Sequence, residues 1–179
     1  MTRVEQERLL LEAVTANPVN ERLLESLDDK VAPNWFLTAG CVCQTMWNHL
    51  TGRDAAYGIR DYDVFYFDSS DLSYVAEDEA VRKALGAIDS SANIQIRNQA
   101  RVHLWYEDRF GIVIQPYTST DDAIATFPTT ATAVGVRKDG AQFEVTAPFG
   151  LADLCAMLVR PNKAQVSAEI YEAKEARWR

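Results

Sequence analysis

Apolar residues recur along this chain with two different spacings, and the first marks a helical N-terminal segment. Between residues 17 and 27 the apolar side chains fall on one helical stripe, formed by Val19, Leu23, Leu24 and Leu27. Asn17 followed by Pro18 is typical of a helix start, because the Asn side chain accepts from free N–H groups and Pro needs no acceptor. We therefore expect residues 1–30 to be helical and to pack inward.

The next part of the chain predicts a strand, a tight turn, a helix and a second strand. Residues 35–39 are mostly apolar and are followed by Gly40. Apolar residues then recur every four positions over 42–50, as expected of a buried helix face. Residues 61–67 are rich in aromatic and β-branched side chains, so they predict a second strand.

Beyond residue 80 the pattern continues to alternate between helices and strands. A helix is expected around 81–88, and the alternation over 93–106 predicts one long strand with a polar face. That polar face carries Gln95, Arg97, Gln99, Arg101 and His103. Asp139-Gly140 indicates the turn of a hairpin over 132–145. Further helices are expected after Ser119, at 151–158 and in an amphipathic tail over 163–179.

Helices interleaved with strands predict an α/β (α+β) fold with a mixed β-sheet flanked by helices. The sequence contains no internal repeat, low-complexity tract or linker, so residues 1–179 are expected to form a single domain. The helical segment 1–30 and the C-terminal helix 163–179 belong to that domain.

Composition and charge narrow the possible partners. The chain has 47% hydrophobic residues and a formal net charge of −8, from 18 basic and 26 acidic residues. With no basic cluster, it lacks the side chains needed to neutralise a phosphate backbone, which argues against tight binding of long nucleic acid. Three cysteines and no apolar run long enough for a signal peptide or membrane span predict a cytoplasmic protein with free thiols and no membrane contact.

The main candidate for chemistry is the pair Asp61 and Asp63, together with the helix that begins after Gly40. Residues two apart in a strand point to the same face, so both carboxylates can converge on one metal ion or straddle two. Mg²⁺ is held in this way, by one or two carboxylates and the phosphates of the substrate. The start of the helix after Gly40 presents N–H groups to which a triphosphate could bind. The alternative from the dipeptide alone is a solvated turn without metal.

Longer strings resemble a bacterial nucleotidyltransferase-like family of small single-domain proteins. The resemblance covers about residues 35–162. It is carried by Ala39-Gly40-Cys41, Gln44-Thr45-Met46-Trp47-Asn48, Arg60-Asp61-Tyr62-Asp63, Tyr66-Phe67-Asp68, the string Arg97-Asn98-Gln99-Ala100-Arg101-Val102-His103-Leu104-Trp105, Ala147-Pro148-Phe149-Gly150-Leu151 and Arg160-Pro161-Asn162. That family is similar to the DNA polymerase beta superfamily, whose members share a glycine turn, a helix, an Asp-x-Asp strand and a third carboxylate on a neighbouring strand.

The resemblance implies a nucleotidyltransferase fold and Mg²⁺-dependent transfer of a nucleoside monophosphate from a nucleoside triphosphate to a small-molecule or protein acceptor. Asp61 and Asp63 would be the catalytic metal ligands, and Gly40 and Cys41 would bind the phosphates. Gln95 stands where the third carboxylate is expected. Cys41 replaces a Ser or Gly that is frequent in the wider superfamily.

Two arginines, Arg97 and Arg101, complete the expected nucleotide site, because a guanidinium can bind phosphate oxygens in a bidentate manner. Three functions remain open at this point. The first is an active Mg²⁺-dependent nucleotidyltransferase. The second is a nucleotide-binding pseudoenzyme, since Gln95 carries no charge and cannot act as a base. The third is an interaction module that retains the fold and docks a partner through its tail.

Overall fold

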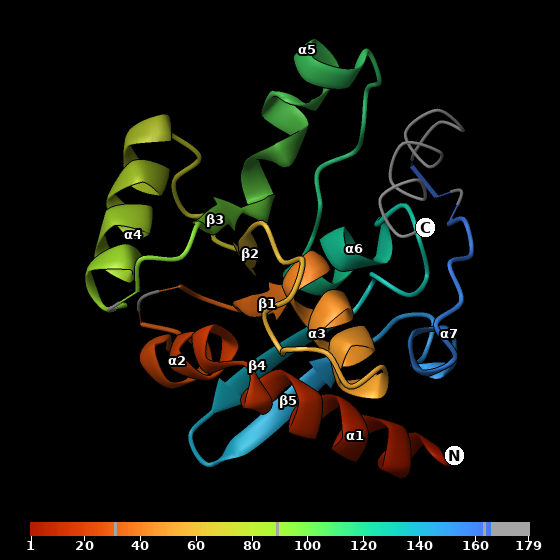
Figure 1. The fold of residues 1–179 in the computed structure, drawn as a ribbon. Helices are drawn as coiled ribbons and strands as arrows, with labels where there is room; N and C mark the ends of the chain where they lie inside the picture. Colours follow the sequence, from red (N-terminus) through yellow and green to blue (C-terminus); the bar gives the residue numbers. More distant parts are fainter. Residues whose placement is uncertain (31, 89, 163, 166–179) are drawn as a thin grey trace.

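The computed structural model describes all residues except 31, 89, 163 and 166–179. It shows a β-sheet with helices on both faces (Figure 1). In chain order the elements are α1 (Arg3–Ala16), α2 (Pro18–Ser26), β1 (Phe36–Thr38), α3 (Gly40–Leu50), β2 (Tyr62–Tyr66), α4 (Tyr74–Gly86), β3 (Ile94–Asn98), a 3₁₀-helix (Gln99–Leu104), α5 (Tyr106–Phe110), α6 (Thr120–Ala125), β4 (Gly135–Asp139), β5 (Gln142–Thr146) and α7 (Ala152–Cys155).

The sheet has five strands in the order β3-β2-β1-β4-β5. Strands β2 and β3 are parallel, whereas β1 is antiparallel to both β2 and β4, and β4 to β5. A parallel pair needs a crossover connection, and α4 supplies it between β2 and β3. The mixed sheet with flanking helices expected from the sequence is confirmed.

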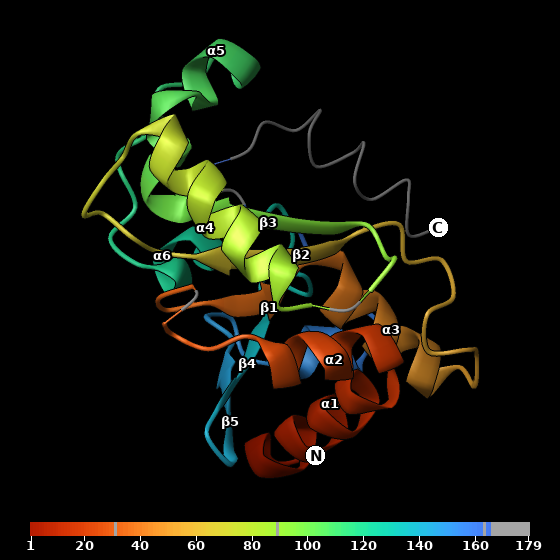
Figure 2. The same ribbon diagram turned by 90° about the vertical axis from the view of Figure 1, so that its left-hand side faces the viewer.

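One face of the sheet is buried in the main hydrophobic core. Leu37, Val64, Ile96 and Val136, one from each of the four strands β1 to β4, point into this core. Helices α1, α2, α3, α4 and α7 contribute further side chains, and connecting segments add others, among them Trp35 and Leu151. Figure 2 shows α1 and α2 packed together beneath the sheet. The stripe expected in the N-terminal segment is part of this core, because Leu23, Leu24 and Leu27 are buried.

The opposite face of the sheet is only partly covered. A small second cluster contains Phe36, Ile124 and Ala133, with Phe65 and Phe127 packed against it. Because Ile124 lies in α6, this short helix covers the sheet where β1 and β2 carry their phenylalanines. On the same face, Asp63 of β2 and Gln95 of β3 are partly exposed, and Arg97 of β3 is exposed.

Asn17 joins the two N-terminal helices to the middle of the chain. Its side-chain oxygen accepts from the N–H groups of Val19 and Asn20, as expected of the N-cap of α2. Its amide nitrogen donates to Thr45 Oγ1 at 3.1 Å and to the carbonyl oxygen of Ala55 at 3.2 Å. The capping residue thus also fixes the orientation of α2 relative to α3.

The long strand expected over 93–106 is wrong beyond residue 98. Asn98 ends β3, and its side-chain oxygen accepts from the N–H of Ala100, which starts a 3₁₀-helix. Helix α5 follows directly. The polar alternation therefore continues into a helical segment, where residues two apart do not share a face. As a result Gln99, Arg101 and His103 are not further positions of strand β3.

Two further expectations concern the C-terminal part. The helix expected over 151–158 is confined to the single turn Ala152–Cys155. The amphipathic tail expected over 163–179 falls almost entirely outside the described residues. Within the part of the chain that is described, no helix has the length and apolar character required to span a membrane.

Candidate active site

Two carboxylates lie side by side on the accessible face of the sheet. Asp61 directly precedes β2 and Asp63 lies within it, and both are half-buried. The alternation of β2 turns Tyr62 and Val64 into the core, so the two aspartates share the opposite face. In the adjacent strands, Asp63 is paired with Thr38 of β1 and with Gln95 of β3.

Gln95 connects the carboxylates to an arginine. Its Nε2 donates to Oδ2 of Asp61 at 3.3 Å, and its Oε1 accepts from Nη2 of Arg97 at 3.0 Å. Arg97 follows Gln95 by two residues on β3 and is solvent-exposed. The structure thus brings Asp61, Asp63, Gln95 and Arg97 together on one surface, which is where the sequence placed them.

The start of α3 lies next to this surface. Ala39 precedes the helix with φ 60° and ψ −134°, a backbone conformation that residues other than glycine rarely adopt. Because alanine has no polar side chain, no side-chain hydrogen bond caps the start of the helix. A Cβ added to Gly40 would meet no protein atom within 4 Å. Open space therefore borders the side of Gly40 on which a Cβ would lie, and free N–H groups at a helix start bind anions.

Cys41 contributes only its backbone to this turn. The residue is fully buried, and its thiol donates to the carbonyl oxygen of Thr38 at 3.0 Å. Burial raises the pKa of the Cys41 thiol strongly, and the negative charge of Asp63 raises it further. The thiol is consequently neutral at physiological pH, so it cannot serve as a thiolate ligand for a metal.

Arg101 is held away from the carboxylates. It forms an ion pair with Glu77 of α4, and its Nε donates to the carbonyl oxygen of Leu72 at 2.9 Å. This position follows from the 3₁₀-helix that replaces the expected strand. Arg101 is therefore not a position of β3, but it lines one hollow of about 520 Å³ together with Arg97. Its nucleotide contact stays a prediction.

The residues on this face suit a magnesium ion that takes most of its other ligands from substrate and water. Within the described residues, no three His, Cys, Asp or Glu side chains are grouped closely enough to hold a metal by themselves. Asp61 and Asp63 supply two carboxylates, and Gln95 supplies a neutral amide oxygen. Mg²⁺ commonly uses one or two protein carboxylates with phosphate oxygens and waters, so this donor set fits it.

An aromatic pocket next to the carboxylates was not expected from the sequence. It has a volume of about 270 Å³. Its lining includes Phe65, Arg97, Trp105, Tyr106, Phe110, Tyr117 and Phe127. The available signal was Phe65, which follows Asp63 by two residues and so shares its face. The other aromatic residues come from segments whose mutual position no local pattern reveals.

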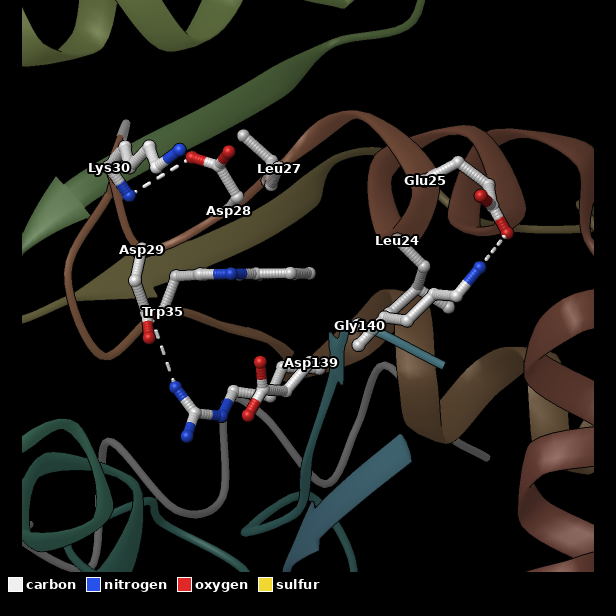
Figure 3. Close-up of a pocket in the computed structure, with 11 residues that line it drawn as sticks. Leu24, Glu25, Leu27, Asp28, Asp29, Lys30, Trp35, Asp139 and Gly140 are labelled. Carbon is white, nitrogen blue, oxygen red and sulfur yellow. Dashed lines mark hydrogen bonds and ion pairs between the residues drawn. The ribbon is translucent and has the colours of Figure 1, made fainter. Parts of the chain in front are cut away.

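Another hollow, of about 370 Å³, lies between α2 and the β4–β5 turn (Figure 3). Its walls include Trp35 and several charged side chains. Arg137 pairs with Asp29 at 3.2 Å, and Lys138 pairs with Glu25. These pairs join the hairpin to α2 and the residues after it, which gives the charges of this hollow a structural role.

Comparisons with known proteins agree with this geometry. Residues 26–179 match the model of a family described as Nucleotidyltransferase. The fold is also similar to a solved NMR structure that is described as revealing a CCA-adding enzyme head domain, with a TM-score of 0.69 and 27% sequence identity. That match covers 92% of this chain and 85% of the other. The comparison with curated proteins gives no match.

Proposed function

Because this chain belongs to the nucleotidyltransferase family, we propose that it transfers a nucleoside monophosphate from a nucleoside triphosphate to a small-molecule or protein acceptor, with Mg²⁺ as cofactor. The observation that carries the proposal is the placement of Asp61 and Asp63 on one accessible sheet face, beside the start of α3. Anion-binding N–H groups and metal-binding carboxylates are the two features that a metal–triphosphate complex requires.

In this proposal each part of the surface has a separate task. The N–H groups at the start of α3 bind the phosphates that will leave as pyrophosphate, and the open space at Gly40 lets them approach the backbone. Asp61 and Asp63 would hold the metal. When bound, Mg²⁺ supplies positive charge at the phosphates during the in-line displacement. Arg97 is placed to bind a phosphate oxygen, because its guanidinium is exposed on the same face.

A nucleotide-binding protein without turnover is the second candidate, and the position of Gln95 favours it. The amide occupies the strand position next to Asp61 where the family resemblance implies a third carboxylate. An amide cannot take the proton of an acceptor hydroxyl. Losing an aligned base typically lowers a rate by about 10²–10⁴-fold. Nucleotide binding would then persist while transfer is weak.

The proposal is tested with the double variant Asp61→Asn and Asp63→Asn. We expect calorimetry to show that it loses Mg²⁺-dependent binding of nucleoside triphosphates. The fold should survive, because removing two neighbouring like charges relieves repulsion in the metal-free protein. A matched control is Asp78→Asn with Glu79→Gln, which removes two exposed charges from α4.

Unchanged Mg²⁺-dependent binding in the double aspartate variant would show that these carboxylates are not the metal site. A separate measurement of turnover by the unmodified protein distinguishes the transferase from the nucleotide-binding protein. Product formation from a labelled triphosphate supports the transferase, and binding without product supports the nucleotide-binding protein.

A further inference from the structure

The aromatic pocket begins at Phe65 on β2 and Arg97 on β3, and the 3₁₀-helix, α5 and the segment around α6 complete it. From this arrangement we propose that it binds the nucleobase of the donor triphosphate. The inference rests on the proposed function, because it assigns the other end of the same ligand. It also gives a role to aromatic side chains that the carboxylate site leaves unexplained.

The pocket and the carboxylates form one continuous surface. Phe65 follows Asp63 by two residues on β2, and Arg97 follows Gln95 by two residues on β3. Both Phe65 and Arg97 line the pocket. The hydrogen bonds from Arg97 to Gln95 and from Gln95 to Asp61 run along the same face. A ligand bound to the carboxylates can therefore reach the pocket without crossing the protein interior.

The order of groups along the sheet matches the order of groups in a nucleoside triphosphate. Because β1 is antiparallel to β2, Thr38 pairs with Asp63 and Phe36 pairs with Phe65. The start of α3, directly after β1, consequently lies at the Asp61 end of β2. The pocket lies at the Phe65 end. If the outer phosphates lie at the start of α3 and the reacting phosphorus lies at the carboxylates, the ribose and base extend toward the pocket.

The spacing also suits one ribose. Two residues along a strand span about 6.5 Å, which is a distance that a sugar ring can bridge between a phosphate and a base. The pocket volume of about 270 Å³ lies just below the range of about 300–1,000 Å³ that whole small-molecule ligands occupy. A pocket of this size accommodates one planar part of a ligand whose remainder lies outside it.

The chemistry of the walls is that of a base-binding site. Aromatic rings provide stacking surfaces for any base, and an arginine at the rim adds a cation–π contribution. The pocket also contains hydroxyl and amide groups that could contact the edge of a base. Tyr117 and Thr126 bond through their hydroxyl oxygens at 3.0 Å, and Gln165 Nε2 donates to the Tyr117 hydroxyl at 2.7 Å.

The experiment compares a ligand with a base against one without. Calorimetry in the presence of Mg²⁺ measures binding of inorganic tripolyphosphate and of ATP, GTP, CTP and UTP to the full chain. We expect the best nucleotide to bind at least tenfold more tightly than tripolyphosphate. Phe110→Ala and Trp105→Leu should each weaken binding of that nucleotide by about 5- to 150-fold, which corresponds to the about 1–3 kcal/mol that removal of a stacking side chain costs. Neither should change tripolyphosphate binding.

A suitable control is Phe143→Ala, because Phe143 on β5 is 38% exposed and Phe110 is 40% exposed. Equal binding of nucleotide and tripolyphosphate, with no effect of the pocket variants, overturns the nucleobase assignment and leaves the proposed function standing. Pocket variants that keep nucleotide affinity but raise the KM for an acceptor also overturn it, since the pocket then binds the acceptor. Absence of Mg²⁺-dependent binding for all five ligands overturns the proposed function itself.

Discussion

Gln95 is the single side chain that most affects the expected chemistry of this surface. Its amide contacts Asp61, so it occupies the space in which a carboxylate would add a third negative charge. In the metal-free protein the amide avoids the repulsion that a third carboxylate would cause. With metal bound, the same neutrality leaves the site with less charge to hold a divalent ion.

The first prediction is that Gln95→Glu increases nucleotidyl transfer. A glutamate would strengthen Mg²⁺ binding and could accept the acceptor's proton, a role worth about 10²–10⁴-fold in rate. Product formation from a labelled triphosphate, with the same acceptor for both proteins, measures the change. Gln142→Glu on exposed β5 introduces the same charge elsewhere. If the natural protein already transfers nucleotide rapidly and Gln95→Glu does not raise the rate, the third metal ligand is another residue.

The second prediction concerns Tyr66, a core residue of β2 that is 2% exposed. Burial raises the pKa of Tyr66 from 10 to about 12, and the neighbouring charge of Asp68 adds to the increase. The unfolded chain therefore loses this proton at lower pH than the folded chain. The contribution of the protonated Tyr66 to the free energy of unfolding is therefore complete below pH 10. About 3 kcal/mol of this free energy is lost as the pH rises toward 12.

Urea unfolding at several pH values between 9 and 12 measures this loss. Tyr66→Phe keeps the ring and removes the ionisable group, so its free energy of unfolding should fall less steeply over the same interval. Identical slopes for the two proteins would mean that Tyr66 does not contribute to the alkaline loss of stability.

Among the elements, those with a clear local period could be predicted and those that depend on distant contacts could not. Strands β1 and β2 and helix α3 follow from their apolar spacing and from the break at Gly40. The end of β3 does not follow from the pattern, because Asn98 fits the alternation as one more strand position. In the structure its side chain caps the following 3₁₀-helix and exchanges hydrogen bonds with the backbone of Asp68.

The same distinction between local pattern and distant contacts applies to the residues of the candidate site. Asp61, Asp63 and Gln95 could be placed together because a strand fixes which side chains share a face. Arg101 could not, since its position depends on Glu77, which lies 24 positions earlier in the chain and reaches it only through the fold. The aromatic pocket likewise combines segments from β2 to beyond α6, and sequence spacing carries no information about such an assembly.

The third prediction is that Asn17→Ala destabilises the protein far more than a helix cap alone would. The variant loses the N-cap of α2 and also the buried hydrogen bonds from the Asn17 amide to Thr45 and to the carbonyl of Ala55. Losing a cap typically costs about 1 kcal/mol, and each lost hydrogen bond costs about 0.5–1.5 kcal/mol. We expect a total loss of about 3 kcal/mol in denaturant unfolding.

The exposed cap Thr2 provides the comparison. It forms a capping box with Glu5 at the start of α1 and makes none of the long-range contacts of Asn17. Thr2→Ala should therefore cost about 1 kcal/mol. Similar losses for the two variants would mean that the contacts of Asn17 with α3 and Ala55 add little.

For the molecule as a whole, the net charge of −8 leads to the fourth prediction. The chain should show no tight binding to DNA or RNA of arbitrary sequence at physiological salt, because it lacks the counterion release that supplies most non-specific affinity. Fluorescence anisotropy with a labelled random oligonucleotide measures this. Submicromolar binding that falls steeply with salt would contradict the prediction and indicate a polymerase-like or RNA-modifying role.

The alternation of β2 restricts how the gene for this protein can change in length. Tyr62, Val64 and Tyr66 face the core, while Asp61 and Asp63 face the ligand side. Insertion of one codon between Asp63 and Val64, or deletion of one codon within the strand, would turn the side chains that follow the change to the opposite face relative to those before it. Either a carboxylate would enter the core or the buried tyrosine and valine would face water. Point substitutions can alter one face at a time, but a one-codon length change in this strand alters both faces together.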